Sequence, residues 1–152
     1  MKDKLDNYEF TNQWFEKTAK PLWSQIINQS KPKKILEIGS YEGASICYLI
    51  DTLSLHHDDF EINAIDTWEG GIEHKETKIN MKLVEERFKK NTSLAIKKSK
   101  KSIELITHKA KSINALSKLI TNKKSGYFDF IYIDGSHIAS DVLSDAILSF
   151  EL

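Results

Sequence analysis

Apolar runs of strand length alternate with stretches of helical periodicity along this chain, and this alternation limits its fold more than any other feature. The four runs are KILEI at residues 34–38, FEINAID at 60–66, SIELITH at 102–108 and YFDFIYID at 127–134. Their two faces are largely apolar, which is typical of strands in a parallel sheet with helices on both sides. Connections between parallel strands are almost always right-handed, so we expect a doubly wound α/β sheet.

Helical periodicity follows each of these runs. The helical stretches are 42–55, 79–91, 112–120 and 137–152. Ser112 stands where a hydroxyl would cap the third of these helices. The lysine-rich residues 96–102 predict a solvated connection, because clustered lysine alone is weak evidence for nucleic-acid binding.

The N-terminal part of the chain predicts a helical preface. Residues 8–29 carry aromatic and aliphatic side chains at the spacing of one or two helices, which Pro21 is expected to separate or restart. The 152 residues of the chain are a usual length for one domain. We therefore expect a preface over residues 1–30 and a Rossmann-like domain over residues 31–152.

Charge and composition exclude several classes of function. Lys and Arg total 22 and Asp and Glu total 22, so no overall field favours nucleic acid or an acidic membrane. The N-terminus lacks the apolar segment of a signal peptide, and no run has the length of a membrane span. Cys47 is the single cysteine and lies in an apolar helical pattern, which predicts a core residue. We expect a cytoplasmic protein without nucleic-acid or membrane partners.

Polar residues mark the carboxyl ends of three predicted strands. Glu37 and Gly39 end the first strand, Asp66 ends the second and Asp134 ends the fourth. Ligands of doubly wound sheets bind at these ends. Glu37 lies inside an apolar run, and a buried carboxylate is costly unless polar groups pair with it. A ligand site at this edge of the sheet would supply such groups.

The loop after the first strand contains Gly39, Ser40, Tyr41 and Gly43, and does not complete the G-x-G-x-x-G pattern of dinucleotide sites. Without that tight loop a pyrophosphate has a poorer cradle at the helix start. A nucleoside without phosphates is less demanding and is therefore the favoured ligand.

The second strand end offers a ribose contact. Asp66 could accept both ribose hydroxyls, as the acid of nicotinamide-binding folds does, or it could cap a turn. Thr67 and Trp68 follow it, and Trp68 could either pack on the nucleoside or belong to the core.

Three phrases together resemble the class I S-adenosylmethionine-dependent methyltransferases: ILEIGSYEG, AIDTWEG and FDFIYIDGSHIASDVLSDAILSF. The IDGSH phrase is similar to the branch of cephalosporin hydroxylase-like and small-molecule O-methyltransferases. The resemblance implies S-adenosylmethionine as cofactor. The cofactor-binding residues that it implies are Glu37, Gly39, Ser40, Gly43, Asp66, Thr67, Trp68 and Ser112, with Ser112 at the adenine.

The fourth strand end would carry the chemistry. Methyl transfer requires positioning and removal of the acceptor's proton, and His137 could serve as the base because its ordinary pKa lies near neutrality. Asp134 could orient His137 or bind Mg²⁺, which prefers oxygen ligands. Alternatively, residues 134–136 form a turn and helix cap. His74 could reach the pocket from a loop, although a solvated position is expected.

The chain ends at LSFEL, before the fifth, sixth and seventh strands that the resemblance implies. We expect a fragment with little methyl transfer of its own. Residues 127–133 would then form an apolar edge, with Phe128, Phe130 and Tyr132 uncovered, through which the protein is expected to self-associate.

The function favoured by these patterns is methyl transfer to a small-molecule acceptor, with an oxygen as the methylated atom. A NAD(P)-dependent oxidoreductase on a similar sheet is one alternative, and the incomplete glycine loop disfavours it. A non-catalytic remnant, or a module that binds a nucleoside or a partner, is another. A nucleic-acid amino-methyltransferase is disfavoured because the D/N-P-P-Y type of motif is absent.

Overall fold

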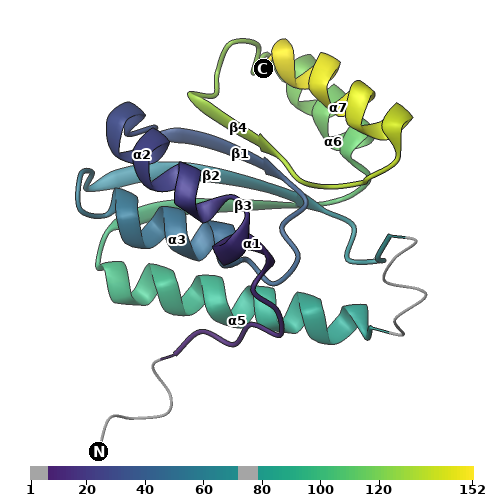
Figure 1. Ribbon diagram of the computed structural model, residues 1–152. Coiled ribbons are helices and arrows are strands. Elements are labelled where there is room, and N and C mark those ends of the chain that lie inside the picture. Colours follow the sequence, from purple (N-terminus) through teal and green to yellow (C-terminus); the bar gives the residue numbers. More distant parts are fainter. Residues whose placement is uncertain (1–6, 72–78) are drawn as a thin grey trace, which may run out of the picture.

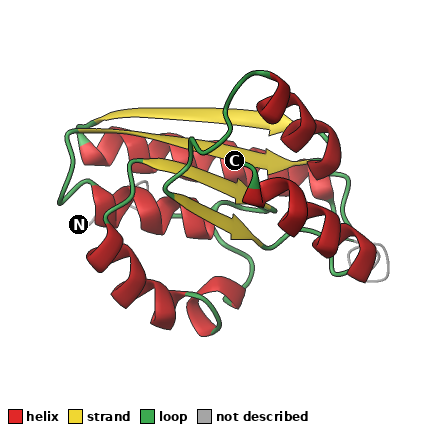
Figure 2. Ribbon diagram, turned by 90° about the horizontal axis from the view of Figure 1, so that it is seen from above, coloured by secondary structure: helices red, strands yellow, loops and turns green. Residues whose placement is uncertain are grey.

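A four-stranded parallel sheet with the order β3-β2-β1-β4 forms the centre of the computed structural model, which describes residues 7–71 and 79–152. His74 lies outside the described residues. The strands are β1 (Lys34–Ile38), β2 (Asp59–Asp66), β3 (Ser102–Lys109) and β4 (Phe130–Ile133). Their arrows point the same way in Figure 2, so all four carboxyl ends share one edge of the sheet.

Helices cover both faces of this sheet (Figures 1 and 2), which confirms the doubly wound α/β fold. One face packs against α2 (Lys20–Ser30), α3 (Ala44–Leu53) and α5 (Met81–Ser99), with the short α1 (Trp14–Lys17) beside them. The other face packs against α6 (Ser112–Thr121) and α7 (Ala139–Phe150).

The two faces of β1 supply two separate apolar clusters. Ile35 belongs to the cluster under α2, α3 and α5, whereas Leu36 and Ile38 belong to the cluster under α6 and α7. All three side chains are at most 2% exposed. Burial on both faces explains why the apolar run is nearly continuous instead of alternating.

The helical preface differs in detail from the prediction. Residues 8–13 are not helical, and the break between α1 and α2 falls at Thr18 and Ala19. Pro21 lies in the first turn of α2, where its missing N–H costs no helical hydrogen bond. Trp23 and Ile27 of α2 are buried in the same cluster as Ile35, so the preface packs directly on the sheet.

Two further predictions about helices were wrong. The lysine-rich stretch is not a loop, because α5 continues to Ser99 and carries Lys97 and Lys98 in its last turn, where cations are favoured by the helix dipole. Ser112 does not cap α6; it is the first helical residue, and Lys111 occupies the cap position without a side-chain hydrogen bond.

Strand β4 is shorter than predicted and partly covered. The backbone N–H groups of Tyr127 and Phe128 donate to the carbonyl of Leu152 instead of joining the sheet. Among the described strands β4 pairs with β1 alone, so it is an edge strand. However, Phe130 and Tyr132 are not uncovered, because Trp23 packs edge-on against both rings at centroid distances of 5.2 and 4.6 Å.

Helix α7 presents an unusual distribution of side chains. Asp145 and Ser149 are buried, whereas five large apolar residues are more than a third exposed. Four of them lie in the helix, Val142, Leu143, Ile147 and Phe150, and the fifth, Ile138, is its N-cap. Within the described part of the chain, no helix is long and apolar enough to cross a membrane.

Candidate functional site

Three strand ends meet at Gly39. Its N–H donates to the carbonyl of Ile65 at the end of β2, over 2.8 Å. A Cβ atom on Gly39 would lie 2.1 Å from the backbone oxygen of Asp134, after β4. Its φ of +90° is also one that side-chain-bearing residues rarely adopt. A glycine at this position therefore allows the loops after β1 and β4 to touch.

Glu37 is fully buried behind the loop that follows β1. Ser40 Oγ donates to its carboxylate at 2.7 Å, and Ser45 Oγ donates to its other oxygen. Burial raises the pKa of Glu37 to about 7, and the nearby charges of Asp134 and Asp66 act in the same direction, whereas the two serine hydrogen bonds oppose them. The polar groups that the sequence required for this acid thus come largely from its own loop.

The carboxylate of Asp66 holds the same loop in place from β2. Its Oδ2 accepts the backbone N–H groups of Ser40 and Tyr41, each at 2.9 Å, and its Oδ1 accepts the N–H of Trp68 at 2.8 Å. A carboxylate offers about four acceptor positions, so about one is left for a ligand hydroxyl. Asp66 therefore caps a turn, and the bidentate ribose contact stays a prediction.

The side chains of Trp68 and Thr67 both contact other parts of the protein and do not line a pocket. Trp68 is 5% exposed, donates from Nε1 to the carbonyl of Tyr41 at 2.9 Å, and packs on Phe88. It lies in the core, which was one of its two predicted positions. Thr67 Oγ1 accepts the N–H of Glu69 at 3.1 Å.

Asp134, the acid that follows β4, lines a pocket and is hydrogen-bonded to Tyr132. The hydroxyl of Tyr132 donates to Asp134 Oδ2 at 2.9 Å. Loss of surrounding water raises the pKa of Asp134, although the residue as a whole is exposed; the Tyr132 hydrogen bond and the charge of His137 oppose the shift. Tyr132 was missed in the sequence, although its position two residues before Asp134 on a strand places both side chains on one side.

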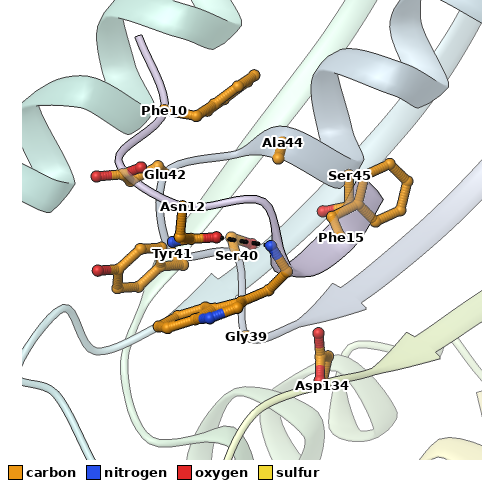
Figure 3. A pocket seen from close by; sticks show the side chains of 11 residues that line it. Phe10, Asn12, Phe15, Gly39, Ser40, Tyr41, Glu42, Ala44, Ser45 and Asp134 are labelled. Carbon is orange, nitrogen blue, oxygen red and sulfur yellow. Dashed lines mark hydrogen bonds between the residues drawn. The ribbon is translucent and has the colours of Figure 1, made fainter. Parts of the chain in front are cut away.

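The pocket is a cavity of about 60 Å³ between the N-terminal segment and the loop after β1 (Figure 3). Its lining residues are Phe10, Asn12, Trp14, Phe15, Gly39, Ser40, Tyr41, Glu42, Ala44, Ser45 and Asp134. The structure thus brings Gly39, Ser40 and Asp134 together. The other predicted site residues do not line this cavity: Glu37, Gly43, Asp66, Thr67, Trp68, Ser112 and the exposed His137.

No metal centre is formed by the described residues, because they contain no group of three or more His, Cys, Asp or Glu side chains that could hold an ion. Asp134 alone is an insufficient donor set for Mg²⁺, which needs several oxygen ligands. No chemical step is therefore assigned to a metal at Asp134.

Comparisons with known proteins bear on the family and the fold. The family model described as "Methyltransferase domain" matches residues 36–152. Among solved structures, an O-methyltransferase from Bacillus cereus in complex with SAH aligns with a TM-score of 0.51 at 18% identity, over 86% of this chain. The chain spans about half of that enzyme, 48% of its length, and the likeness shows the fold alone. No curated protein sequence matches this chain significantly.

Proposed function

Because the chain belongs to the methyltransferase domain family, we propose that it binds S-adenosylmethionine and serves methyl transfer to an oxygen of a small-molecule acceptor. The observation that carries the proposal is the meeting of three strand ends at Gly39, with Glu37, Asp66 and Asp134 around it. Ligands of doubly wound sheets bind at such a point.

The charge of the site supports a phosphate-free cofactor. The carboxylates of Asp66 and Asp134 would disfavour a pyrophosphate beside the loop after β1, whereas they suit a ligand that carries an ammonium group, a sulfonium group and ribose hydroxyls. This argues against the alternative of a NAD(P)-dependent oxidoreductase. S-adenosylmethionine, when bound, supplies a methyl group on a cationic sulfur that an acceptor oxygen displaces in line.

Each residue of the site has a proposed part. The loop from Gly39 to Gly43 would hold the methionine portion, and the remaining acceptor position of Asp66 would take one ribose hydroxyl. We assign removal of the acceptor's proton to Asp134, because it lines the cavity and its raised pKa makes it a better base than an ordinary aspartate. His137 lies outside the cavity, and its charge would lower the pKa of Asp134.

Binding of S-adenosylhomocysteine (SAH) to the purified chain tests the proposal. Calorimetry should show a single site, and SAH should raise the melting temperature while NADH should not. Stabilisation by NADH without any by SAH would favour the oxidoreductase alternative and overturn the proposal. A methyl-transfer assay with Asp134→Asn then tests the base, since the variant should lose turnover while it keeps SAH affinity.

A further inference from the structure

The N-terminal strap, defined here as residues 8–15, crosses the molecule from the outer helices to the pocket. Tyr8 at its start donates to Asp51 of α3 at 2.8 Å. The next residue of the strap, Glu9, is bound to Asn91 of α5. The side chain of Asn91 accepts the N–H of Glu9 at 2.8 Å and donates to the carbonyl of Glu9 at 3.0 Å. The strap is thus bound to two helices before it reaches the cavity.

Glu42, in the loop after β1, is the main anchor of this strap. Its carboxylate accepts the backbone N–H of Thr11 at 2.7 Å and the hydroxyl of Thr11 at 2.8 Å. Arg87 of α5 donates to the same carboxylate from Nε at 2.5 Å. Glu42 is 2% exposed. A charged partner offsets the cost of burying the Glu42 carboxylate, and Arg87 is the one arginine of the sequence.

On both sides of Thr11 the strap forms one wall of the pocket. Phe10, Asn12, Trp14 and Phe15 line the cavity opposite Gly39 and Asp134 (Figure 3). The indole ring of Trp14 packs on the ring of Tyr41, with centroids 5.3 Å apart. The strap therefore contacts the loop that would hold a cofactor and also faces the acid that would act on an acceptor.

We propose that the strap is the acceptor-side wall of the ligand site and that Arg87, acting through Glu42 and Thr11, is the positioning residue that holds it there. The wall assignment rests on the proposed function, whereas the anchor does not. The strap forms one side of this cavity of about 60 Å³, so a ligand bound there would lie against it.

Trp14 gives this proposal a direct readout. Of the three tryptophans of the sequence, Trp14 is 55% exposed, whereas Trp23 and Trp68 are 4% and 5% exposed. Quenching of tryptophan fluorescence by acrylamide therefore reports mainly on the strap. In the wild type, saturating SAH should change this quenching, because the ligand occupies the space beside Trp14.

The test compares Arg87→Ala, Arg87→Lys and Thr11→Val with Lys89→Ala as the matched control. Lys89 makes an ion pair with Glu85 on the same helix, and this pair does not involve the strap. Arg87→Ala should increase quenching without ligand, because the buried Glu42 carboxylate loses its charged partner. It should also weaken SAH binding severalfold, because the wall is no longer held beside the ligand. Arg87→Lys should restore part of both values, and Lys89→Ala should match the wild type.

Thr11→Val keeps the test valid if Arg87→Ala does not fold, because Thr11 is exposed and the Glu42–Arg87 pair stays intact. If folded Arg87→Ala or Thr11→Val protein shows the same quenching as the wild type without ligand, these residues do not anchor the strap. If a variant has a released strap but binds SAH as tightly as the wild type, the strap is not a wall of the ligand site. If the wild type itself binds no SAH, the proposed function and the wall both fail, while quenching without ligand still decides the anchor.

Discussion

Asp66, at the end of β2, accepts the backbone N–H of Ser40, in the loop after β1, at a distance of 2.9 Å. With the N–H groups of Tyr41 and Trp68 on the same carboxylate, the acid of one strand fixes the loop of its neighbour. The shape of the candidate cofactor loop therefore depends on a residue 26 positions later in the chain.

Asp66→Ala should destabilise the protein as well as weaken SAH binding. The variant leaves three backbone N–H groups without their acceptor, and we expect the free energy of unfolding to fall by about 3 kcal/mol. Urea unfolding measures this loss, and calorimetry should show SAH affinity at least about tenfold lower, the usual effect of losing a hydrogen bond to a charged group. Equal unfolding energies and equal affinities for variant and wild type would remove Asp66 from both roles.

Gly39→Ala should be far more damaging than Gly126→Ala. Both glycines have positive φ, +90° and +62°, so each substitution carries about 1–2 kcal/mol of backbone strain. At Gly39 the added Cβ would also meet the backbone of Asp134, whereas at Gly126 nothing lies within 4 Å. Thermal unfolding should show a small loss for Gly126→Ala and a loss of several kcal/mol for Gly39→Ala. Similar losses at both positions would contradict the close approach of the two loops.

Glu37→Gln should change how stability depends on pH. Glu37 loses its proton near pH 4.5 in the unfolded chain but near pH 7 in the folded one. Between these values the folded state binds more protons, so this acid makes the protein less stable as pH rises through that window. The full effect is about 3 kcal/mol.

The glutamine variant carries no such charge. Its free energy of unfolding, relative to that of the wild type, should therefore increase by that amount between pH 4.5 and 7.5 in urea titrations. A difference that stays constant with pH would show that Glu37 titrates normally.

We expect a second copy of this chain to pack on the exposed face of α7 and on the edge of β4 that no described strand pairs with. The five exposed apolar residues of α7 and its N-cap offer on the order of 600 Å² in each copy, so two copies together approach the lower limit of stable interfaces. Antiparallel pairing of two β4 edges about a two-fold axis would bring the same face of each α7 together, as an isologous interface requires.

Phe150→Lys should abolish this dimer with little effect on folding, because Phe150 is 91% exposed. Leu55→Lys is the matched control, since Leu55 is 81% exposed and belongs to neither α7 nor β4. Tyr132 is a poorer site for a charge because it packs on Trp23. Sedimentation velocity should show a dimer for the wild type and Leu55→Lys and a monomer for Phe150→Lys. A monomeric wild type, or a dimer that tolerates the lysine at position 150, would contradict this interface.

Local pattern was sufficient to predict most of the fold. The bounds of β1 agree with the prediction because every side chain from Ile35 to Ile38 is buried, so the apolar run and the strand coincide. The length of α5 was underestimated because Asn91 and Thr92 occupy buried positions between Phe88 and Ala95. Two polar residues in the buried stripe interrupted the apolar periodicity, although the helix continued.

The candidate site was predictable only in part, for a related reason. Gly39, Asp66 and Asp134 follow apolar runs directly, and parallel strands bring such ends together. The wall formed by the strap depends on contacts of Thr11 with Glu42, and of Glu42 with Arg87, across long stretches of chain. Such contacts leave no local period, so Tyr8 and Phe10 were interpreted as helical, whereas the helix begins only at Trp14.

The hydrogen bond between Glu9 and Asn91 joins residues 82 positions apart and has a consequence for synthesis. A chain emerges from the ribosome N-terminus first, at about 5–20 residues per second. The strap is thus made before every strand, yet Arg87 and Asn91 follow only after β1, α3 and β2. The earliest segment takes its final place late, and the nascent protein carries the unburied aromatic rings of Phe10, Trp14 and Phe15 for several seconds, the interval in which a chaperone can recognise them.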